Sequence, residues 1–294
     1  METIRTIYSD HPALTTIAGG LVVATAGILV YRRLRRNTTA SNAEEDYPKD
    51  TVILHQIGRG PFAPSMTPFA IKLETYLRIA KIPYKNVHDM KKSSKGKYPW
   101  ISFNGHSVAD SAFCIEFINK KRNVDLSSWL SPEQRAVALA FQRLAEEDIY
   151  WVLVCQRWVQ HLDMDLVAKA FPKWRFASFG VKYMLSPAIR KKAWEQGMGR
   201  HSSEEVVHIA RKDLTALSDY LGTKRFLMGD QPCEEDCAIF GQLSQLYWQL
   251  TGPTSNMFKE EFPRLVSYCE RMKDRFWPDW VECTTQGGTS KATK

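Results

Sequence analysis

Thiols are the first side chains to consider, because cysteine supports nucleophilic, redox and metal-binding chemistry. The 294-residue chain has six, and none belongs to a Cys-x-x-Cys pair; they are Cys114, Cys155, Cys233, Cys237, Cys269 and Cys283. This scattered spacing argues against a zinc site, and no metal ligands are predicted. Free thiols in a reducing compartment are the simpler interpretation.

One carboxylate and one histidine could transfer protons. Asp148 falls on the predicted face of a long helix, with Glu146 and Glu147 beside it, and could act as a general acid or base. More often such a residue lines a groove between domains or pairs with a nearby cation. His201 ends a Gly-Met-Gly-Arg turn, and we expect it to be a structural turn residue.

Two hydroxyl side chains, Ser65 and Thr67, stand at the end of a Gly/Pro-rich loop. The apolar residues that follow recur at helical spacing and predict a helix that begins at Pro68. Thr67 is placed to cap this helix, and proline suits its first turn. Loop plus N-cap is therefore the simplest interpretation of the two hydroxyls.

The elements around that loop alternate between strand and helix. β-Branched residues predict a strand over 51–57, and a short strand is expected over 84–87. The Asn104-Gly105 dipeptide predicts a hairpin with a type I′ turn, and Asp110-Ser111 opens a further helix. This order predicts a thioredoxin-like subdomain over residues 51–124.

The second part of the chain, residues 125–283, is predicted to be all α-helical, with a flexible tail over 284–294. Capping boxes begin at Ser131 and Ser202, where glutamine or glutamate follows three residues later. Gly222 fits the C-terminal cap of the second of these helices. The fold class is therefore α+β, with 44% apolar residues and enough length for a well-buried interior.

A basic and aromatic stretch runs from Leu166 to Trp194 without an acidic residue. Lysine and arginine interleaved with aromatic rings suit a membrane interface, and they could also bind an acidic protein surface. A solvated basic face over aromatic core contacts is the remaining alternative. The net charge of +8 favours anionic partners, but no nucleic-acid motif is present, and nucleic acid is not a predicted partner.

An uncharged segment begins at Ala13 and ends at Tyr31, which is just long enough to cross a bilayer. Arginines follow it at once, so the remainder of the chain is predicted to face the cytosol. A cleaved signal peptide fits badly, because the basic cluster follows the apolar run. We predict a single-pass anchor over residues 1–36 and a linker over 37–50. Its length and flanks suit the mitochondrial outer membrane or the endoplasmic reticulum.

Several of these residues resemble the glutathione-binding positions of glutathione transferases. Such proteins place a cis-proline before the third strand, as at Pro99-Trp100, and an acidic residue and a serine at the next helix, as at Asp110-Ser111. The resemblance implies a possible glutathione site there. Thiol-transfer members carry Cys-Pro-Phe where this chain has Thr67-Pro68-Phe69. Ser65 and Thr67 are the candidates that could hydrogen-bond a thiolate. A hydroxyl cannot form a mixed disulfide.

The C-terminal half also resembles these proteins, since a Ser/Thr-x-x-Asp box opens their buried helix. Asp236 matches the aspartate as a structural residue, whereas Cys233 replaces the hydroxyl residue and should weaken the cap.

Four motifs narrow the likeness: residues 64–78, 95–101, 196–202 and 236–241 resemble the failed axon connections family, a metaxin-like branch that includes nematode cadmium-responsive proteins. This resemblance implies a non-catalytic interaction protein with a role in axon development. The alternative is a glutathione-binding enzyme for electrophiles or cadmium. Protein partners are not predicted, and a homodimer stays open.

Overall fold

The computed structural model describes residues 47–89, 91–170 and 177–285. The chain divides into two compact units, Met1–Tyr47 and Pro48–Lys294, and the helices and strands described belong to the second. The predicted anchor, most of the predicted linker and most of the predicted tail lie outside the described residues. Within those three described ranges, no helix is long and apolar enough to cross a membrane.

Four strands form one mixed sheet in the order β2-β1-β3-β4. They are β1 (Val52–Gln56), β2 (Tyr84–His88), β3 (Trp100–Phe103) and β4 (His106–Ala109). β1 pairs parallel with β2 and antiparallel with β3, and β3 and β4 form the predicted hairpin. Its turn residues Asn104 and Gly105 have φ angles of 46° and 78°, as a type I′ turn requires. The predicted thioredoxin-like order is confirmed.

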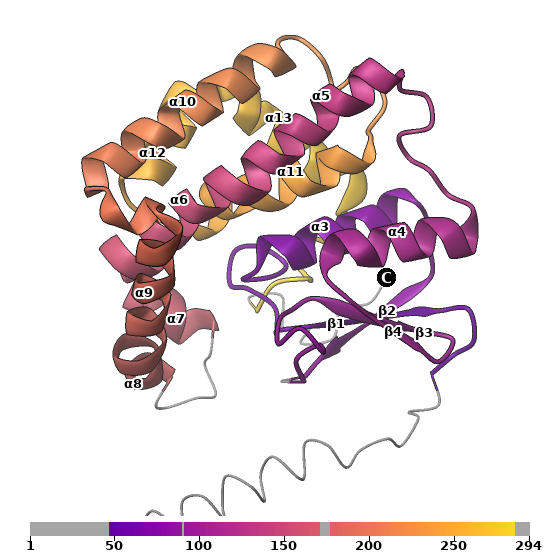
Figure 1. Cartoon of the computed structure of the whole chain (residues 1–294), viewed down its shortest axis with the longest axis horizontal. Coiled ribbons are helices and arrows are strands. Elements are labelled where there is room, and N and C mark those ends of the chain that lie inside the picture. The colour runs from indigo at the N-terminus through magenta and orange to yellow at the C-terminus, as the bar shows by residue number, and fades with distance from the viewer. Residues whose placement is uncertain (1–46, 90, 171–176, 286–294) are drawn as a thin grey trace, which may run out of the picture. The chain divides into compact units, whose positions relative to one another are not determined.

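Two helices, α3 (Pro68–Ile79) and α4 (Ser111–Arg122), cover the same face of the sheet (Figure 1). Their side chains close a core with the strands through Leu54, Leu77 and Ile115. The helix predicted at Pro68 begins there, and Thr67 occupies the N-cap position. The expectation that Thr67 caps it is wrong in one respect, because its side chain makes no capping hydrogen bond.

The second half consists of helices joined by turns and loops within its described residues. Its first helices are α5 (Pro132–Arg143), the π-helical turn η1 (Leu144–Ile149), α6 (Tyr150–Val154), the π-helical turn η2 (Cys155–Gln160), α7 (Met164–Ala170), α8 (Ala177–Gly180), the π-helical turn η3 (Val181–Leu185), α9 (Ser186–Gln196) and the 3₁₀ turn η4 (Met198–Arg200). The later ones are α10 (Ser203–Leu221), α11 (Glu234–Ser244), the π-helical turn η5 (Gln245–Gln249), α12 (Pro253–Glu261) and α13 (Pro263–Phe276).

Local capping signals place these helices correctly. Ser131 and Gln134 form a reciprocal capping box at α5, and Ser202 and Glu205 form another at α10. Helix α11 carries buried residues along its whole length and packs against α3. The two halves therefore share a buried boundary, in which α3 is covered by the sheet on one side and by α11 on the other.

Candidate functional site

Strand register brings the predicted site segments to one edge of the sheet. His55 near the end of β1 pairs with Trp100 at the start of β3, and Trp100 pairs with Ala109 at the end of β4. The loop after β1, the residue before β3 and the residue after β4 therefore emerge side by side. These segments carry Thr67, Pro99 and Asp110 respectively, so the structure gathers residues that lie far apart in the sequence.

The two hydroxyls of the loop have different surroundings. Ser65 is buried, at 1% exposed, and its Oγ accepts a hydrogen bond from the Thr67 N–H at 3.3 Å. Thr67 is half-buried at the N-terminus of α3, where unpaired amides and the helix dipole favour an anion. Thr67 is thus the better placed of the two to meet a ligand.

Side chains from the helical half hold this loop from behind. Arg157 Nη1 donates to the Met66 carbonyl at 3.1 Å, and Gln245 Nε2 donates to the Ser65 carbonyl at 3.1 Å. Arg157 is itself buried and its Nη2 donates to Gln245 Oε1 at 3.0 Å. Burial lowers the pKa of the Arg157 guanidinium to about 10. A buried cation therefore stands directly behind the position that corresponds to the reactive one.

The cis peptide between Tyr98 and Pro99 matches the expectation for that proline. Trp100, directly after it, is buried: its ring stacks on His55 with centroids 3.6 Å apart, and its Nε1 donates to the Lys91 carbonyl at 2.9 Å. His55 lies 3.4 Å from Asp89 Oδ2 and 3.2 Å from Ser102 Oγ. The Trp100 indole is therefore engaged inside the protein, and its backbone lies within the sheet between β1 and β4.

Asp110 and Ser111 open α4. Asp110 Oδ1 accepts from the Ala112 N–H at 3.0 Å, so the helix-cap interpretation holds geometrically. Its φ of 85° and ψ of 130° are a conformation that side-chain-bearing residues rarely adopt. Such backbone strain costs about 1–3 kcal/mol and clusters at ligand clamps. Ser111, buried at the first helical turn, lies next to it.

Asp236 is fully buried at the start of α11. Its Oδ1 accepts from the Leu227 N–H at 2.9 Å and from the Tyr268 hydroxyl at 2.8 Å. Its Oδ2 accepts from the Cys233 N–H at 2.9 Å, and the Cys233 thiol donates to the same oxygen at 3.2 Å. Asp236 thus joins α11, the preceding loop and α13.

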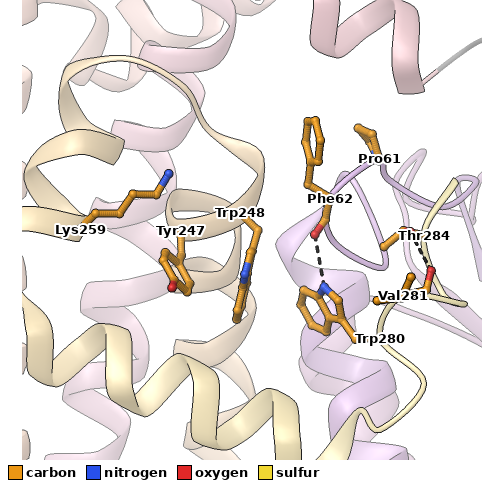
Figure 2. A pocket seen from close by; sticks show the side chains of 8 residues that line it. All are labelled: Pro61, Phe62, Tyr247, Trp248, Lys259, Trp280, Val281 and Thr284. Carbon is orange, nitrogen blue, oxygen red and sulfur yellow. Dashed lines mark hydrogen bonds between the residues drawn. The ribbon is translucent and has the colours of Figure 1, made fainter. Parts of the chain in front are cut away.

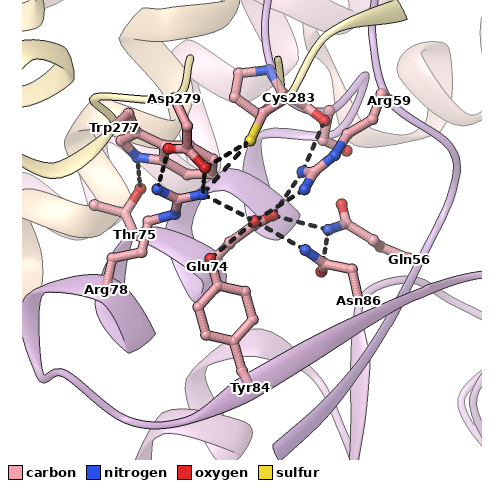
Figure 3. Close-up of polar contacts among 12 residues, drawn as sticks. Gln56, Arg59, Glu74, Thr75, Arg78, Tyr84, Asn86, Trp277, Asp279 and Cys283 are labelled. Atoms are coloured by element: carbon pink, nitrogen blue, oxygen red, sulfur yellow. Dashed lines mark hydrogen bonds and ion pairs between the residues drawn. The ribbon is translucent and has the colours of Figure 1, made fainter. Parts of the chain in front are cut away.

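Buried charges in α3 were missed by the sequence analysis. Glu74 lies at the centre of a polar cluster, where its carboxylate takes bonds from both Arg59 terminal nitrogens, from Asn86 and from Gln56 (Figure 3). Burial alone would raise the pKa of Glu74, but Arg59 together with Arg78 and Asn86 outweighs burial and holds the pKa below the usual range. The sequence does hold a signal for this burial. Helix α3 is apolar on several sides, which is typical of a helix that is buried all round, so its charged residues would be buried too.

The same cluster reaches the end of the chain. Arg78 forms a two-pronged ion pair with Asp279, its guanidinium lies 3.9 Å from the centre of the Trp277 ring, and Trp277 Nε1 donates to Thr75 Oγ1 at 3.0 Å. Figure 3 shows that the segment after α13 meets α3 here. A second buried pair, Lys72 Nζ to Glu146 Oε1 at 2.7 Å, joins α3 to η1.

Asp148 does not form the site suggested by its sequence context. It is half-buried on η1, beside Asp213 of α10. Burial and the neighbouring Asp148 raise the pKa of Asp213 to about 7. His201 lies in a turn, and its Nδ1 is 3.5 Å from Glu205 Oε2, which agrees with a structural role. All six cysteines are free and buried.

Two hollows lie elsewhere on the second unit. One, of about 360 Å³, is walled by Phe62, Tyr247, Trp248 and Trp280, with Lys259 at its rim (Figure 2). The other, of about 680 Å³, lies between the end of η2 and α9. Neither has any of the predicted site residues in its lining.

Comparison with protein families places both halves. The description "Glutathione S-transferase N-terminal domain" matches residues 68–164, and "Glutathione S-transferase, C-terminal domain" matches residues 210–272. Among solved structures, the β-etherase LigF from Sphingobium superposes with a TM-score of 0.54 at 16% identity, covering 76% of this chain and 95% of that one. Glutathione transferase URE2P6 from Phanerochaete chrysosporium, in complex with oxidised glutathione, superposes with a TM-score of 0.52 at 15% identity. The superposition covers 80% of this chain and 98% of that one. At these identities the likeness shows the fold alone, which is that of a glutathione transferase.

Curated relatives narrow the assignment. Failed axon connections from Drosophila melanogaster is 34% identical over 82% of this chain, which spans 62% of that protein's length. Isoprene-epoxide–glutathione S-transferase from Rhodococcus is 30% identical over 72% of this chain and 94% of the relative. Metaxin-2 from Mus musculus is 22% identical over 81% of this chain and 93% of the relative. The chain belongs to the failed axon connections family, in the metaxin-like branch of the glutathione transferase fold.

Proposed function

We propose that this protein is a membrane-anchored, cytosol-facing interaction protein with a non-catalytic glutathione-transferase-like domain. The anchor is the uncharged segment from Ala13 to Tyr31, and the membrane is the mitochondrial outer membrane or that of the endoplasmic reticulum. The name of the Drosophila relative suggests a role in forming axon connections. Its protein partners are to be sought on the cytosolic side.

The loop geometry supports the absence of thiol transfer. Thr67 offers a hydroxyl at the start of α3, which cannot enter disulfide exchange, and Ser65 is buried with its oxygen already bonded. Arg157 and Gln245 fix the backbone on either side of them. A loop tied in this way to the second half is suited to holding two subdomains in one arrangement, as an interaction surface requires.

A second candidate is a glutathione-binding enzyme that handles electrophiles or metals such as cadmium. One observation favours it: the strained backbone of Asp110 sits where the resemblance places the grip on the γ-glutamyl carboxylate. The N-terminal amides of α4 point to the same place, and amides at a helix start bind carboxylates. The Rhodococcus relative, named for a glutathione transfer to an epoxide, adds to it.

Two measurements on the full-length chain separate these functions. Calorimetry with reduced glutathione tests binding, and product formation from glutathione and a model epoxide tests transfer. The proposed function expects no transfer, whether or not glutathione binds, and sustained turnover would overturn it. Binding that Asp110→Ala abolishes, while Glu116→Ala on the same helix leaves it intact, would locate the tripeptide at the start of α4.

The anchor has its own test. Deleting residues 1–36 should move the protein from the carbonate-resistant membrane pellet to the soluble fraction, because the deletion removes the whole uncharged run. Replacing Arg32, Arg33, Arg35 and Arg36 with glutamate, in the otherwise complete chain, should alter protease protection or organelle. A truncated chain that still resists carbonate would show that another part of the protein holds the membrane.

A further inference from the structure

Helices α8 and α9 and the turn η3 between them present an exposed apolar surface. Phe179, Tyr183, Met184 and Trp194 are 62%, 57%, 73% and 58% exposed. The Phe179 and Tyr183 rings contact each other at a tilt of 43°, with centroids 4.7 Å apart. Isolated exposed apolar side chains are ordinary, but a group of large ones this exposed marks a contact surface. We call these four residues and the cations around them the α8–α9 face.

Cations outnumber carboxylates on this face. Lys182, Lys191 and Lys192 are exposed, and residues 177–194 contain no carboxylate. The neighbouring Glu195 lies 3.9 Å from Lys191, and both side chains are mostly solvent-exposed, so this pair neutralises little. The Lys182 ammonium group lies 5.3 Å from the centre of the Tyr183 ring, which puts cation and apolar surface side by side.

A groove runs along the same face. The hollow of about 680 Å³ lies between the end of η2 and α9. Its lining combines the apolar side chains of Leu162 and Trp194 with three cations and one carboxylate, namely Lys182, Arg190, Lys191 and Glu195. Arg190 donates to the Val159 carbonyl at 2.8 Å, which fixes one cation at the groove wall. The groove therefore offers donors and positive charge, with apolar surface directly beneath.

We propose that the α8–α9 face docks on the surface of an anionic phospholipid bilayer. Lysines would lie among the lipid phosphates, and Phe179, Tyr183, Met184 and Trp194 would enter the boundary between headgroups and acyl chains, as amphipathic interfacial helices do. Tryptophan and tyrosine prefer that level of a bilayer. An acidic protein partner would also satisfy the lysines, but lysine is depleted at protein–protein interfaces relative to the rest of the surface.

This docking does not depend on the proposed anchor. Anchoring concerns residues 1–36, whereas docking concerns described residues of the second unit. The two can be measured apart, because flotation with vesicles reports attachment by any route and a probe on the face reports docking alone.

The experiment uses one reporter on the full-length chain. All six native cysteines are buried, so Met184→Cys creates an accessible thiol for an environment-sensitive fluorophore. The labelled protein is reconstituted with vesicles of phosphatidylcholine, with or without phosphatidylserine, that carry spin-labelled lipids. Docking predicts quenching by shallow spin labels with phosphatidylserine, little quenching without it, and loss of quenching at high salt.

Charge reversal supplies the matched control. Lys182→Glu, Lys191→Glu and Lys192→Glu together should weaken docking by at least about a hundredfold, since each lysine near an anionic surface contributes on the order of a fivefold gain. Lys85→Glu, Lys120→Glu and Lys121→Glu make the same change of charge on exposed residues of β2 and α4 and should leave docking intact.

Equal fluorescence with neutral and anionic vesicles would overturn the proposal, and so would equal effects of the two triple variants. The unmodified chain gives a second readout that needs no variant: amide exchange over residues 179–189 should slow with anionic vesicles. An unchanged exchange rate, with protein demonstrably attached to the vesicles, contradicts docking even where the anchor holds.

Discussion

Replacing Asp236 with alanine removes the carboxylate that accepts from four buried donors. The Leu227 and Cys233 N–H groups and the Tyr268 hydroxyl lie 2.8–2.9 Å from its oxygens, and the Cys233 thiol lies at 3.2 Å. The Tyr268 hydroxyl keeps the backbone carbonyl of residue 236 as an acceptor, at 3.2 Å, so the two N–H groups carry most of the loss. Each buried donor left without a partner costs about 1–3 kcal/mol. Burial raises the pKa of the Asp236 carboxyl group, so removing the charge returns part of its desolvation cost. We expect Asp236→Ala to lower the free energy of unfolding by about 3–5 kcal/mol.

Two further variants test the assignment donor by donor. Asp236→Asn keeps the shape but can accept from only one of the two backbone N–H groups, and should cost about 2–3 kcal/mol. Tyr268→Phe removes one hydroxyl and should cost about 1–2 kcal/mol. Chemical denaturation followed by circular dichroism gives the three values. The reasoning would be refuted if Asp236→Ala stayed within about 1 kcal/mol of wild type. It would also be refuted if the losses did not decrease from Asp236→Ala to Asp236→Asn to Tyr268→Phe.

Three other changes test the site and its surroundings. Thr67→Cys should create a thiol with a pKa about 1–3 units below that of a free cysteine, because the α3 amides and the buried Arg157 favour a thiolate; a pH profile of alkylation measures it, and a midpoint near that of free cysteine contradicts it. Wild type should show no glutathione-dependent reduction of a mixed disulfide. Lys72→Met should destabilise the fold by about 3–5 kcal/mol in chemical denaturation, since it leaves the buried Glu146 with only the exposed Arg143, 3.7 Å away, as a cation. Lys72→Met combined with Glu146→Gln should recover most of this, and additive losses would speak against the pair. Asp213, whose pKa is raised to about 7, holds a proton in the folded state that the unfolded chain releases near pH 4. The contribution of Asp213 to the free energy of unfolding should therefore fall as pH rises from about 4 to 7. Asp213→Asn should gain melting temperature over wild type across that window, and parallel curves would exclude the effect.

Local chemistry in the sequence predicts most of the fold. The Asn104-Gly105 turn and the capping boxes at Ser131 and Ser202 each act within four residues, so no distant information is needed to read them. Helix starts and the hairpin are therefore predicted well. The strand pairing follows, because only one order of these elements gives a thioredoxin-like sheet.

Buried polar residues are where sequence reasoning fails. The long helix that follows the first capping box buries Gln142, Glu146 and Gln156 among its apolar residues. Glu146 pairs with Lys72, which lies 74 residues earlier in the chain, and a local hydrophobic pattern does not reveal such a partner. Gln142 and Gln156 donate within the helix, to Glu146 and Gln160, but nothing in the periodicity marks them as buried.

The sequence predicts where the candidate site lies, but not the buried charge behind it or the backbone conformation within it. Motif likeness indicates Thr67, Pro99 and Asp110, and the register of β1, β3 and β4 brings their segments together. The buried Arg157 behind the loop and the positive φ of Asp110 follow from tertiary packing and backbone geometry. Neither leaves a periodic trace in the sequence.

The pairing of Arg78 with Asp279 has a consequence for biosynthesis. The partners are separated by 201 residues, and Trp277 covers the same guanidinium. Because translation proceeds from the N-terminus, the first subdomain leaves the ribosome with Arg78 still lacking its partner. Contacts this distant in sequence close late and slowly. Chain termination just after α13 would therefore damage the thioredoxin-like subdomain, although every residue of that subdomain would still be present.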